Sequence, residues 1–137
     1  MDGNKMNLID TNVIIRFLTA DKTSKFEGVY KLFSRLEDGL EKVEIKPLVF
    51  FQCIFVLKSF YKLDREKIYY LLDAIVNLQG VYMEKKQIYL RTLEIFNNSN
   101  IEIMDSYLIA CIEEKPETSL YSFDKDFDKF NVKRIEP

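Results

Sequence analysis

Residues 6–14 join a short apolar run, an acid and a polar turn, and they constrain the fold more than any other part of the chain. The apolar run ends at Asp10, and apolar positions with helical spacing begin again at Val13. This pattern predicts a strand, an acidic turn and a helix in direct succession, which is how α/β folds begin. Because open α/β sheets place their ligands at the carboxyl ends of the strands, the segment also predicts an active site at Asp10.

The remaining pattern predicts a single α/β domain over residues 1–137. A chain of 137 residues, 47% of them hydrophobic, can close one sizeable core and has little left for a second. Apolar spacing, caps and breakers predict helices near 13–18, 26–39, 47–61, 64–76, 85–96 and 103–112, with a helical turn at 124–130. Short strands are predicted near 43–45, 119–122 and 132–135, and a brief strand or a connector at 80–82. The helix that begins at Pro47 is apolar nearly all round, so we expect it to be central.

The charge balance and the absence of histidine restrict the chemistry. Twenty basic and 22 acidic residues give a net charge of −2, so no general basic surface is expected to hold nucleic acid. A phosphate-bearing substrate would need a metal ion or a local patch. The chain has 0 histidines, which excludes the serine and cysteine triads and removes most zinc sites. Hydrolytic chemistry would therefore rest on carboxylates.

The cysteines and the apolar runs indicate a compartment. Cys53 and Cys111 lie in apolar stretches without CxxC spacing, so we expect buried, reduced thiols. Residues 1–5 are too few and too polar for a signal peptide. Residues 48–57, the most apolar run, fall well short of the roughly 20 residues of a membrane span. We expect a cytoplasmic protein with no membrane partner.

Two further acids accompany Asp10. Asp105 shares a helical face with Ile109 and Ile112, which predicts an inward direction. The alternative is an acid in the first helical turn that simply meets the positive end of the helix dipole. Asp124 follows a short apolar strand, as Asp10 does, so both would emerge at the same edge of a parallel sheet. The alternative is that Asp124 only caps the turn that follows it.

Clustered carboxylates imply a cation. Three or more of them repel one another and raise one another's pKa unless a positive charge compensates them. Mg²⁺ and Mn²⁺ prefer oxygen ligands, which suits a site built from aspartates without histidine. Such an ion lowers the pKa of a bound water and stabilises the oxygens of a phosphodiester during cleavage. A metal ion of this kind would explain how an acidic protein could cleave RNA.

Three segments resemble the motifs of PIN domains. Residues 8–15 (LIDTNVII) resemble the opening motif, and residues 105–110 (DSYLIA) resemble the third acidic motif. Residues 122–127 (SFDKDF) are similar to the closing Thr-x-Asp segment, with Ser122 in the threonine place. The resemblance covers essentially the whole chain, in order and with suitable spacing.

The resemblance implies a three-layer α/β/α sandwich with a short, mainly parallel sheet. It also implies a metal-dependent endoribonuclease like the VapC toxins of toxin–antitoxin pairs, with an RNA substrate, an antitoxin partner and a homodimeric state. By position, Mg²⁺ or Mn²⁺ would be held by Asp10, Asp105 and Asp124, with Asp126 as an auxiliary acid. The ligands or the substrate would be oriented by Thr11, Asn12, Gln52 and Ser122.

Gln52 departs from the family pattern. Residues 49–57 (VFFQCIFVL) match a segment that usually carries a glutamate where this chain has Gln52. An amide keeps the shape and one carbonyl ligand, but it gives up the charge and cannot act as a base. The affinity of the site for a metal ion should therefore drop. The alternative interpretation of Gln52 is a buried core amide whose hydrogen bonds are satisfied. The alternative function is an attenuated PIN domain that binds RNA or a protein.

Three other patterns have weaker functional interpretations. Asp10 as a phosphoryl acceptor is disfavoured, because Asn12 stands where haloacid-dehalogenase-like phosphatases carry a second aspartate. Several tyrosines could stack on bases, although aromatic residues at helical spacing more often lie in the core; they are Tyr61, Tyr69, Tyr70, Tyr82 and Tyr89. Several basic residues could touch RNA phosphates, although a solvated helix surface is the better interpretation; they are Lys58, Lys62, Arg65 and Lys67.

Overall fold

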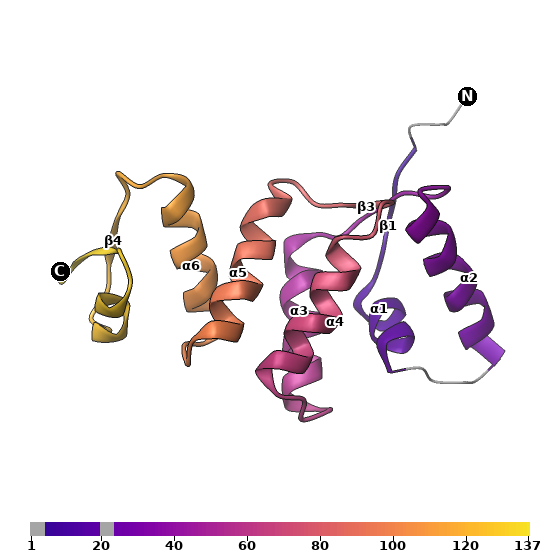
Figure 1. Ribbon diagram of the computed structural model, residues 1–137, viewed down its shortest axis with the longest axis horizontal. Helices are drawn as coiled ribbons and strands as arrows, with labels where there is room; N and C mark the ends of the chain where they lie inside the picture. Colours follow the sequence, from indigo (N-terminus) through magenta and orange to yellow (C-terminus); the bar gives the residue numbers. More distant parts are fainter. Residues whose placement is uncertain (1–4, 20–23) are drawn as a thin grey trace. The chain divides into compact units, whose positions relative to one another are not determined.

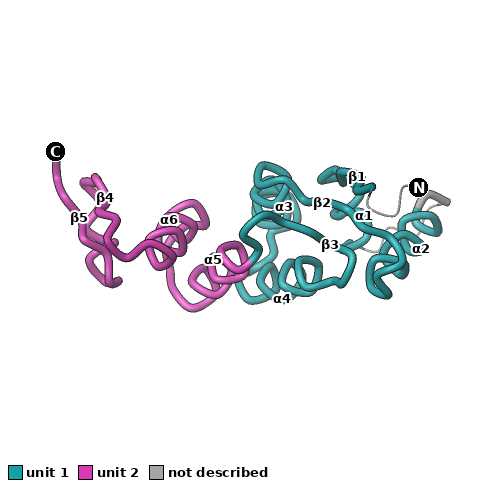
Figure 2. Tube along the Cα trace, turned by 90° about the horizontal axis from the view of Figure 1, so that it is seen from above, with its two compact units in different colours: residues 1–86 teal, residues 87–137 magenta. Residues whose placement is uncertain are grey.

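The computed structural model describes residues 5–19 and 24–137 (Figure 1). The chain forms two compact units, one that ends at Lys86 and one that begins at Gln87 (Figure 2). In both units the described strands alternate with helices and pair in parallel. The predicted α/β class with a short parallel sheet is therefore confirmed, whereas a single domain over 1–137 stays a prediction.

The first unit is a three-stranded parallel sheet with two helices before each new strand. The sheet order is β1-β2-β3, with Asn7 opposite Val43 and Val43 opposite Val81. Parallel pairing follows because a helical crossover returns the chain to the same end of the sheet. The elements are β1 (Asn7–Leu8), α1 (Thr11–Leu18), α2 (Ser24–Asp38), β2 (Val43–Glu44), α3 (Pro47–Ser59), α4 (Arg65–Val76) and β3 (Val81–Tyr82).

The helix ends follow their predicted signals. Pro47 occupies the first turn of α3, where its missing N–H costs nothing. Asp64 caps α4 by accepting the Lys67 backbone N–H at 2.9 Å. Gly39 follows α2 with a φ of 75°, a conformation that glycine adopts without strain. Caps and breakers therefore set the helix boundaries in this unit.

The prediction that α3 is central is wrong on one of its faces. The helix packs against α1 and α4 and buries Phe50, Ile54 and Leu57. On the opposite face Leu48 is 83% exposed and Phe55 is 53% exposed. The two are seven residues apart, which is two helical turns, so they share one side of the helix. The residues of α3 are apolar on nearly every side of the helix, but only one side of it is buried.

The second unit is smaller and contains the remaining elements. Its strands β4 and β5 pair in parallel, with Leu120 opposite Arg134. None of the helices in the described part of the chain has the length and hydropathy that a membrane span requires. The elements are α5 (Lys86–Asn98), α6 (Ile103–Glu114), β4 (Ser119–Tyr121), the 3₁₀ helix η1 (Lys125–Lys129) and β5 (Lys133–Ile135).

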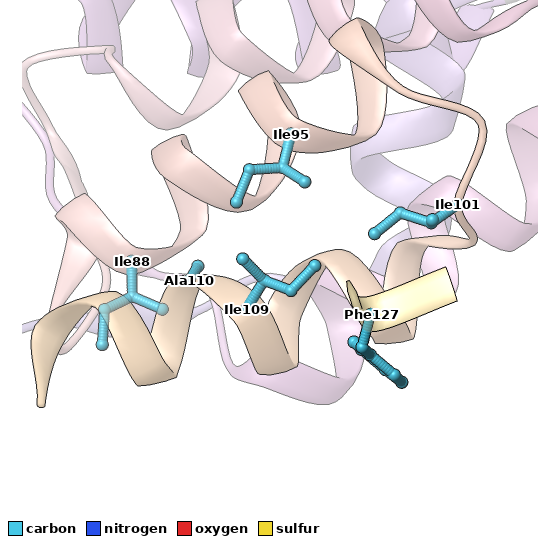
Figure 3. Packing of buried hydrophobic residues seen from close by; sticks show 6 residues of the cluster. All are labelled: Ile88, Ile95, Ile101, Ile109, Ala110 and Phe127. Atoms are coloured by element: carbon cyan, nitrogen blue, oxygen red, sulfur yellow. The ribbon is translucent and has the colours of Figure 1, made fainter. Parts of the chain in front are cut away.

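A hydrophobic cluster holds the second unit together (Figure 3). Side chains from α5 and α6 pack against one another, and Phe127 of η1 joins them. The segment between β4 and β5 is thus anchored to α6 through Phe127. The cluster consists of Ile88, Ile95, Ile101, Ile109, Ala110 and Phe127. Both cysteines are free thiols, and the predicted burial holds for Cys53 in the first unit, whereas Cys111 in the second is only half-buried.

Candidate active site

Asp10 lies where the sequence predicts it, between the carboxyl end of β1 and the start of α1. Its Oδ1 accepts the Thr11 backbone N–H at 2.8 Å and caps the helix. The preceding Ile9 is buried and its N–H donates to the Glu44 carbonyl at 3.3 Å, so the turn is tied to β2. The Asp10 side chain is exposed. A rigid turn therefore presents this carboxylate to solvent.

Thr11 joins the Asp10 turn to α3. Its side chain is 4% exposed, and its hydroxyl donates to Oε1 of Gln52 at 2.6 Å. Gln52 itself is exposed, so the alternative of a buried core amide is wrong. The physical reason is that Gln52 lies at the edge of the buried face of α3, where its carbonyl reaches Thr11. Asn12, in the first turn of α1, is also exposed.

The Cys53 thiol, next in sequence to Gln52, lies in the same environment as the Asp10 turn. Burial raises the pKa of Cys53 to about 12, and the negative charge of Asp10 adds to the rise. A hydrogen bond with Thr11 acts in the opposite direction. Cys53 is therefore a neutral packing group beside the acidic turn, and it is neither a nucleophile nor a metal ligand.

Asp105 carries the clearest electrostatic signal of the second unit. It lies in the first turn of α6 and is half-buried. Burial raises the pKa of its carboxyl group, and the negative charges of Asp124, Glu102 and Asp126 raise it further. The predicted site residues Asp124 and Asp126 thus lie close enough to Asp105 to repel its negative charge.

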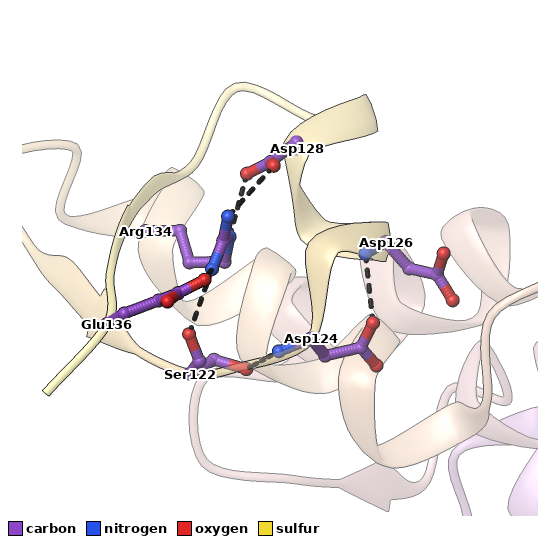
Figure 4. Close-up of polar contacts among 6 residues, drawn as sticks. All are labelled: Ser122, Asp124, Asp126, Asp128, Arg134 and Glu136. Atoms are coloured by element: carbon purple, nitrogen blue, oxygen red, sulfur yellow. Dashed lines mark hydrogen bonds and ion pairs between the residues drawn. The ribbon is translucent and has the colours of Figure 1, made fainter.

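The turn after β4 is organised by hydrogen bonds among its own residues (Figure 4). The Asp124 backbone N–H donates to Oγ of Ser122 at 3.0 Å. The Oδ1 of Asp124 in turn accepts the Asp126 backbone N–H at 2.9 Å and caps η1. Asp124 is therefore a cap and Asp105 a first-turn acid, as the alternatives stated. A carboxylate has about four lone-pair sites, so capping leaves ligand capacity.

Arg134 is a supporting residue that the sequence interpretation missed. Its side chain, only 12% exposed, binds Asp128 through two bonds of 2.9 and 3.1 Å (Figure 4). It also donates to the Ser122 carbonyl at 3.1 Å and to Glu136 at 2.9 Å. The guanidinium lowers the pKa of Asp128. Arg134 ties the loop of Ser122 and Asp124 to β5. An arginine in a short strand, with Asp128 before the strand and Glu136 after it, is the sequence feature that could have predicted this role.

The predicted site residues fall into two groups, one in each unit. The first unit brings together Asp10, Thr11 and Gln52, and the second brings together Asp105, Asp124 and Asp126. Among the described residues, no three histidine, cysteine or acidic side chains converge closely enough to hold a metal ion. The donors are nonetheless all oxygens, and the repulsion around Asp105 is what a cation relieves. In this respect the chemistry of the donor set fits a hard dication.

The chain is similar to known proteins over nearly its whole length. The sequence model of one family, the PIN domain, matches residues 8–133, a range that includes every predicted site residue. A VapC ribonuclease of Aquifex aeolicus (strain VF5) is 24% identical over 132 residues. That alignment covers 96% of this chain and 97% of the relative.

Proposed function

The chain belongs to the PIN domain family, and on this premise we propose that it is a metal-dependent endoribonuclease of the VapC kind. Its substrate would be RNA, and its biological role that of the toxin in a toxin–antitoxin pair. The similarity to a VapC ribonuclease over almost the full length of both chains supports this assignment. Family membership also agrees with the predicted three-layer α/β/α class.

The observation that carries the proposal is the electrostatic environment of Asp105. Burial raises the pKa of Asp105, and the negative charges of Asp124, Glu102 and Asp126 raise it further, so its charged form is unfavourable on its own. Natural proteins retain such clusters where a bound cation compensates them. A purely structural first-turn acid has no need of two further acids beside it.

We assign the metal to Asp10, Asp105 and Asp124, with Asp126 as the auxiliary acid. Bound Mg²⁺ or Mn²⁺ would lower the pKa of a water and stabilise the charge on the phosphodiester oxygens. This assignment draws ligands from both units of the chain. It requires Asp10 of the first unit to share an ion with the acids of the second.

The neighbouring polar groups would position these acids and the substrate. The Thr11 hydroxyl fixes the Gln52 carbonyl beside the Asp10 turn. Ser122 holds the backbone of Asp124, and the Asp126 backbone N–H holds its carboxylate. The amide of Asn12, which is exposed two residues after Asp10, would donate to a phosphate oxygen.

The proposal extends to partners and compartment. We propose a homodimer, which the exposed apolar face of α3 with Leu48 and Phe55 supports. An antitoxin protein would inhibit the enzyme, and the two free thiols agree with a reducing cytoplasm.

A second candidate function rests on Gln52. Its neutral amide stands where the family usually has an acid, and Thr11 holds its carbonyl in place. One negative charge fewer weakens the hold on a dication. The candidate is an attenuated PIN domain that binds RNA or a protein partner.

The deciding experiment is an RNA cleavage assay with and without Mn²⁺ on the natural chain, Asp10→Asn and Gln52→Glu. We expect cleavage that needs the metal and is lost in Asp10→Asn. Asp64→Asn is the matched control, because Asp64 is also an exposed N-cap and asparagine caps equally well. Cleavage that persists in a chelator would overturn the nuclease mechanism. Cleavage that appears only in Gln52→Glu would establish the attenuated alternative.

A further inference from the structure

A hollow in the first unit lies beside α1, the helix that Asp10 caps. It has a volume of about 360 Å³. Four of its lining residues come from α1 or directly follow it, and the fifth, Tyr61, follows α3. The lining consists of Asn12, Ile15, Arg16, Thr19 and Tyr61.

The helical period explains why these residues share one wall. Arg16 is four residues and Thr19 seven residues after Asn12, so all three lie on one face of α1. At 1.5 Å per residue this wall runs for about 10 Å from the first turn of the helix. Asn12, in the first turn of α1, is the lining residue nearest in sequence to Asp10, so its end of the hollow is the one closer to the acidic turn.

Tyr61 forms the aromatic wall and is held by its backbone. Its N–H donates to the Val56 carbonyl at 3.2 Å, and Lys62 follows with a φ of 59°. Its ring meets the Phe60 ring edge to face, with centroids 4.9 Å apart. The side chain is 39% exposed, so the core interpretation does not hold for this tyrosine.

We infer that this hollow is a nucleotide subsite for single-stranded RNA next to the cleaved bond, an inference that rests on the proposed function. An unpaired base would stack on Tyr61, and Arg16 would contact the adjoining phosphate. Asn12 would donate to a phosphate or base oxygen. In a chain of net charge −2, the Arg16 cation in the lining of this hollow would be the local positive charge that a phosphate needs.

An aromatic face beside an arginine and an amide favours a nucleotide over an apolar peptide side chain. Every base has a π-face, so stacking on Tyr61 is independent of sequence. The guanidinium of Arg16 matches phosphate oxygens in charge and geometry. The hollow would therefore hold substrate and position the scissile bond without reading many bases.

The stacking role is tested by RNA binding in metal-free buffer with a chelator, so that no cleavage occurs. The probe is a short, fluorescently labelled single-stranded oligoribonucleotide, and the readout is fluorescence anisotropy. We expect Tyr61→Ala to raise Kd at least about 5-fold, and Tyr61→Phe to bind like the natural chain. Tyr70→Ala is the matched control, because Tyr70 is 64% exposed and also contacts a neighbouring ring.

The phosphate contact is tested by salt dependence, which a merely structural role would not change. We expect Arg16→Gln to reduce the slope of log Kd against log salt concentration by about 0.7, the value for one contact to single-stranded nucleic acid. Lys31→Gln, which removes an exposed cation of α2, should leave the slope unchanged.

The outcomes separate this inference from the proposed function. If the natural chain cleaves RNA but Tyr61→Ala and Arg16→Gln behave like their controls, the subsite is overturned and the nuclease stands. The hollow would then be left to a protein partner. If the natural chain neither binds nor cleaves RNA with Mn²⁺ present, both the subsite and the proposed function are overturned.

Discussion

Gln52 sets the charge of the proposed metal site. A glutamate at this position would still accept the Thr11 hydroxyl, now 2.6 Å from Oε1. The variant Gln52→Glu should therefore fold normally and bind Mn²⁺ at least about tenfold more tightly, because dication affinity rises with the number of ligand charges. Isothermal titration with Mn²⁺ measures this. Gln79→Glu is the control, because Gln79 precedes β3 at the opposite end of the parallel strands. Equal affinity of Gln52→Glu and the natural chain would remove Gln52 from the site.

The two thiols should differ in reactivity. Burial and the charge of Asp10 raise the pKa of Cys53 to about 12, so almost none of it is thiolate near pH 8. We expect Cys53 to resist a thiol reagent in the folded protein and to react once urea unfolds the chain. The Cys111→Ser variant isolates Cys53 for this measurement. Rapid labelling of folded Cys111→Ser would show that Cys53 is not buried.

Arg134 supports the loop of Ser122 and Asp124 through its bidentate contact with Asp128. We expect Arg134→Gln to lower Tm and to weaken Mn²⁺ binding, whereas Arg35→Gln, which breaks an exposed pair with Glu41, should affect neither strongly.

The same contact should make this loss of stability depend on pH. Because Arg134 lowers the pKa of Asp128, their contact stabilises the fold above the ordinary pKa of an aspartate and is lost as pH falls through the lowered pKa. The Tm difference between the natural chain and Arg134→Gln should therefore shrink below about pH 4. A difference that grows on acidification would contradict the assigned contact.

At the scale of elements, Gly80 shows how closely β3 approaches the segment between α2 and β2. A Cβ at Gly80 would lie 2.0 Å from the Glu41 carbonyl oxygen, a backbone atom that cannot move aside easily. We expect Gly80→Ala to lower the free energy of unfolding by about 1–3 kcal/mol or more. Gly28→Ala is the opposite case, because nothing lies within 4 Å of its Cβ in α2. It should stabilise by about 0.5–1 kcal/mol. Urea denaturation of both variants tests the pair, and a stable Gly80→Ala would contradict the close approach.

Element boundaries were predictable where a local signal sets them. Pro47 and Asp64 start their helices as predicted, because capping depends on neighbouring residues. The end of α5 was missed by two residues, because Asn97 and Asn98 continue the helix before Ser99 bonds back to Ile95 at 2.7 Å. Turn propensity is a weak preference that tertiary packing overrides.

Some site residues were likewise predictable from the local sequence, whereas others depend on tertiary packing. Asp10 and Asp124 were predictable because both follow a strand, which is a local pattern. The exposure of Gln52 depends on which face of α3 is covered, and composition does not reveal that. Arg134 was not predicted to support the site, because its contact with Asp128 is set by the fold and not by spacing. Tyr61 was named among the tyrosines that could stack on bases, but its place in the hollow beside α1 depends on the fold.

At the scale of the whole molecule, the proposed metal site takes ligands from both units of the chain. A dication whose free concentration is 100 times its Kd should stabilise the folded state by about 2.7 kcal/mol. We expect Mn²⁺ to raise Tm for the natural chain and for Asp64→Asn, but not for Asp10→Asn or Asp124→Asn. Calorimetry in chelator and in Mn²⁺ provides the comparison. Stabilisation of Asp10→Asn equal to that of the natural chain would place the ion in the second unit alone.

The most direct test is a Mn²⁺ titration followed by electron paramagnetic resonance, in which free ion is observed and bound ion is not. We predict that the natural chain binds the ion and that Asp10→Asn, Asp105→Asn and Asp124→Asn each lose most of that affinity, with Asp64→Asn unchanged. Loss in Asp105→Asn and Asp124→Asn with full binding by Asp10→Asn would contradict a site that both units share.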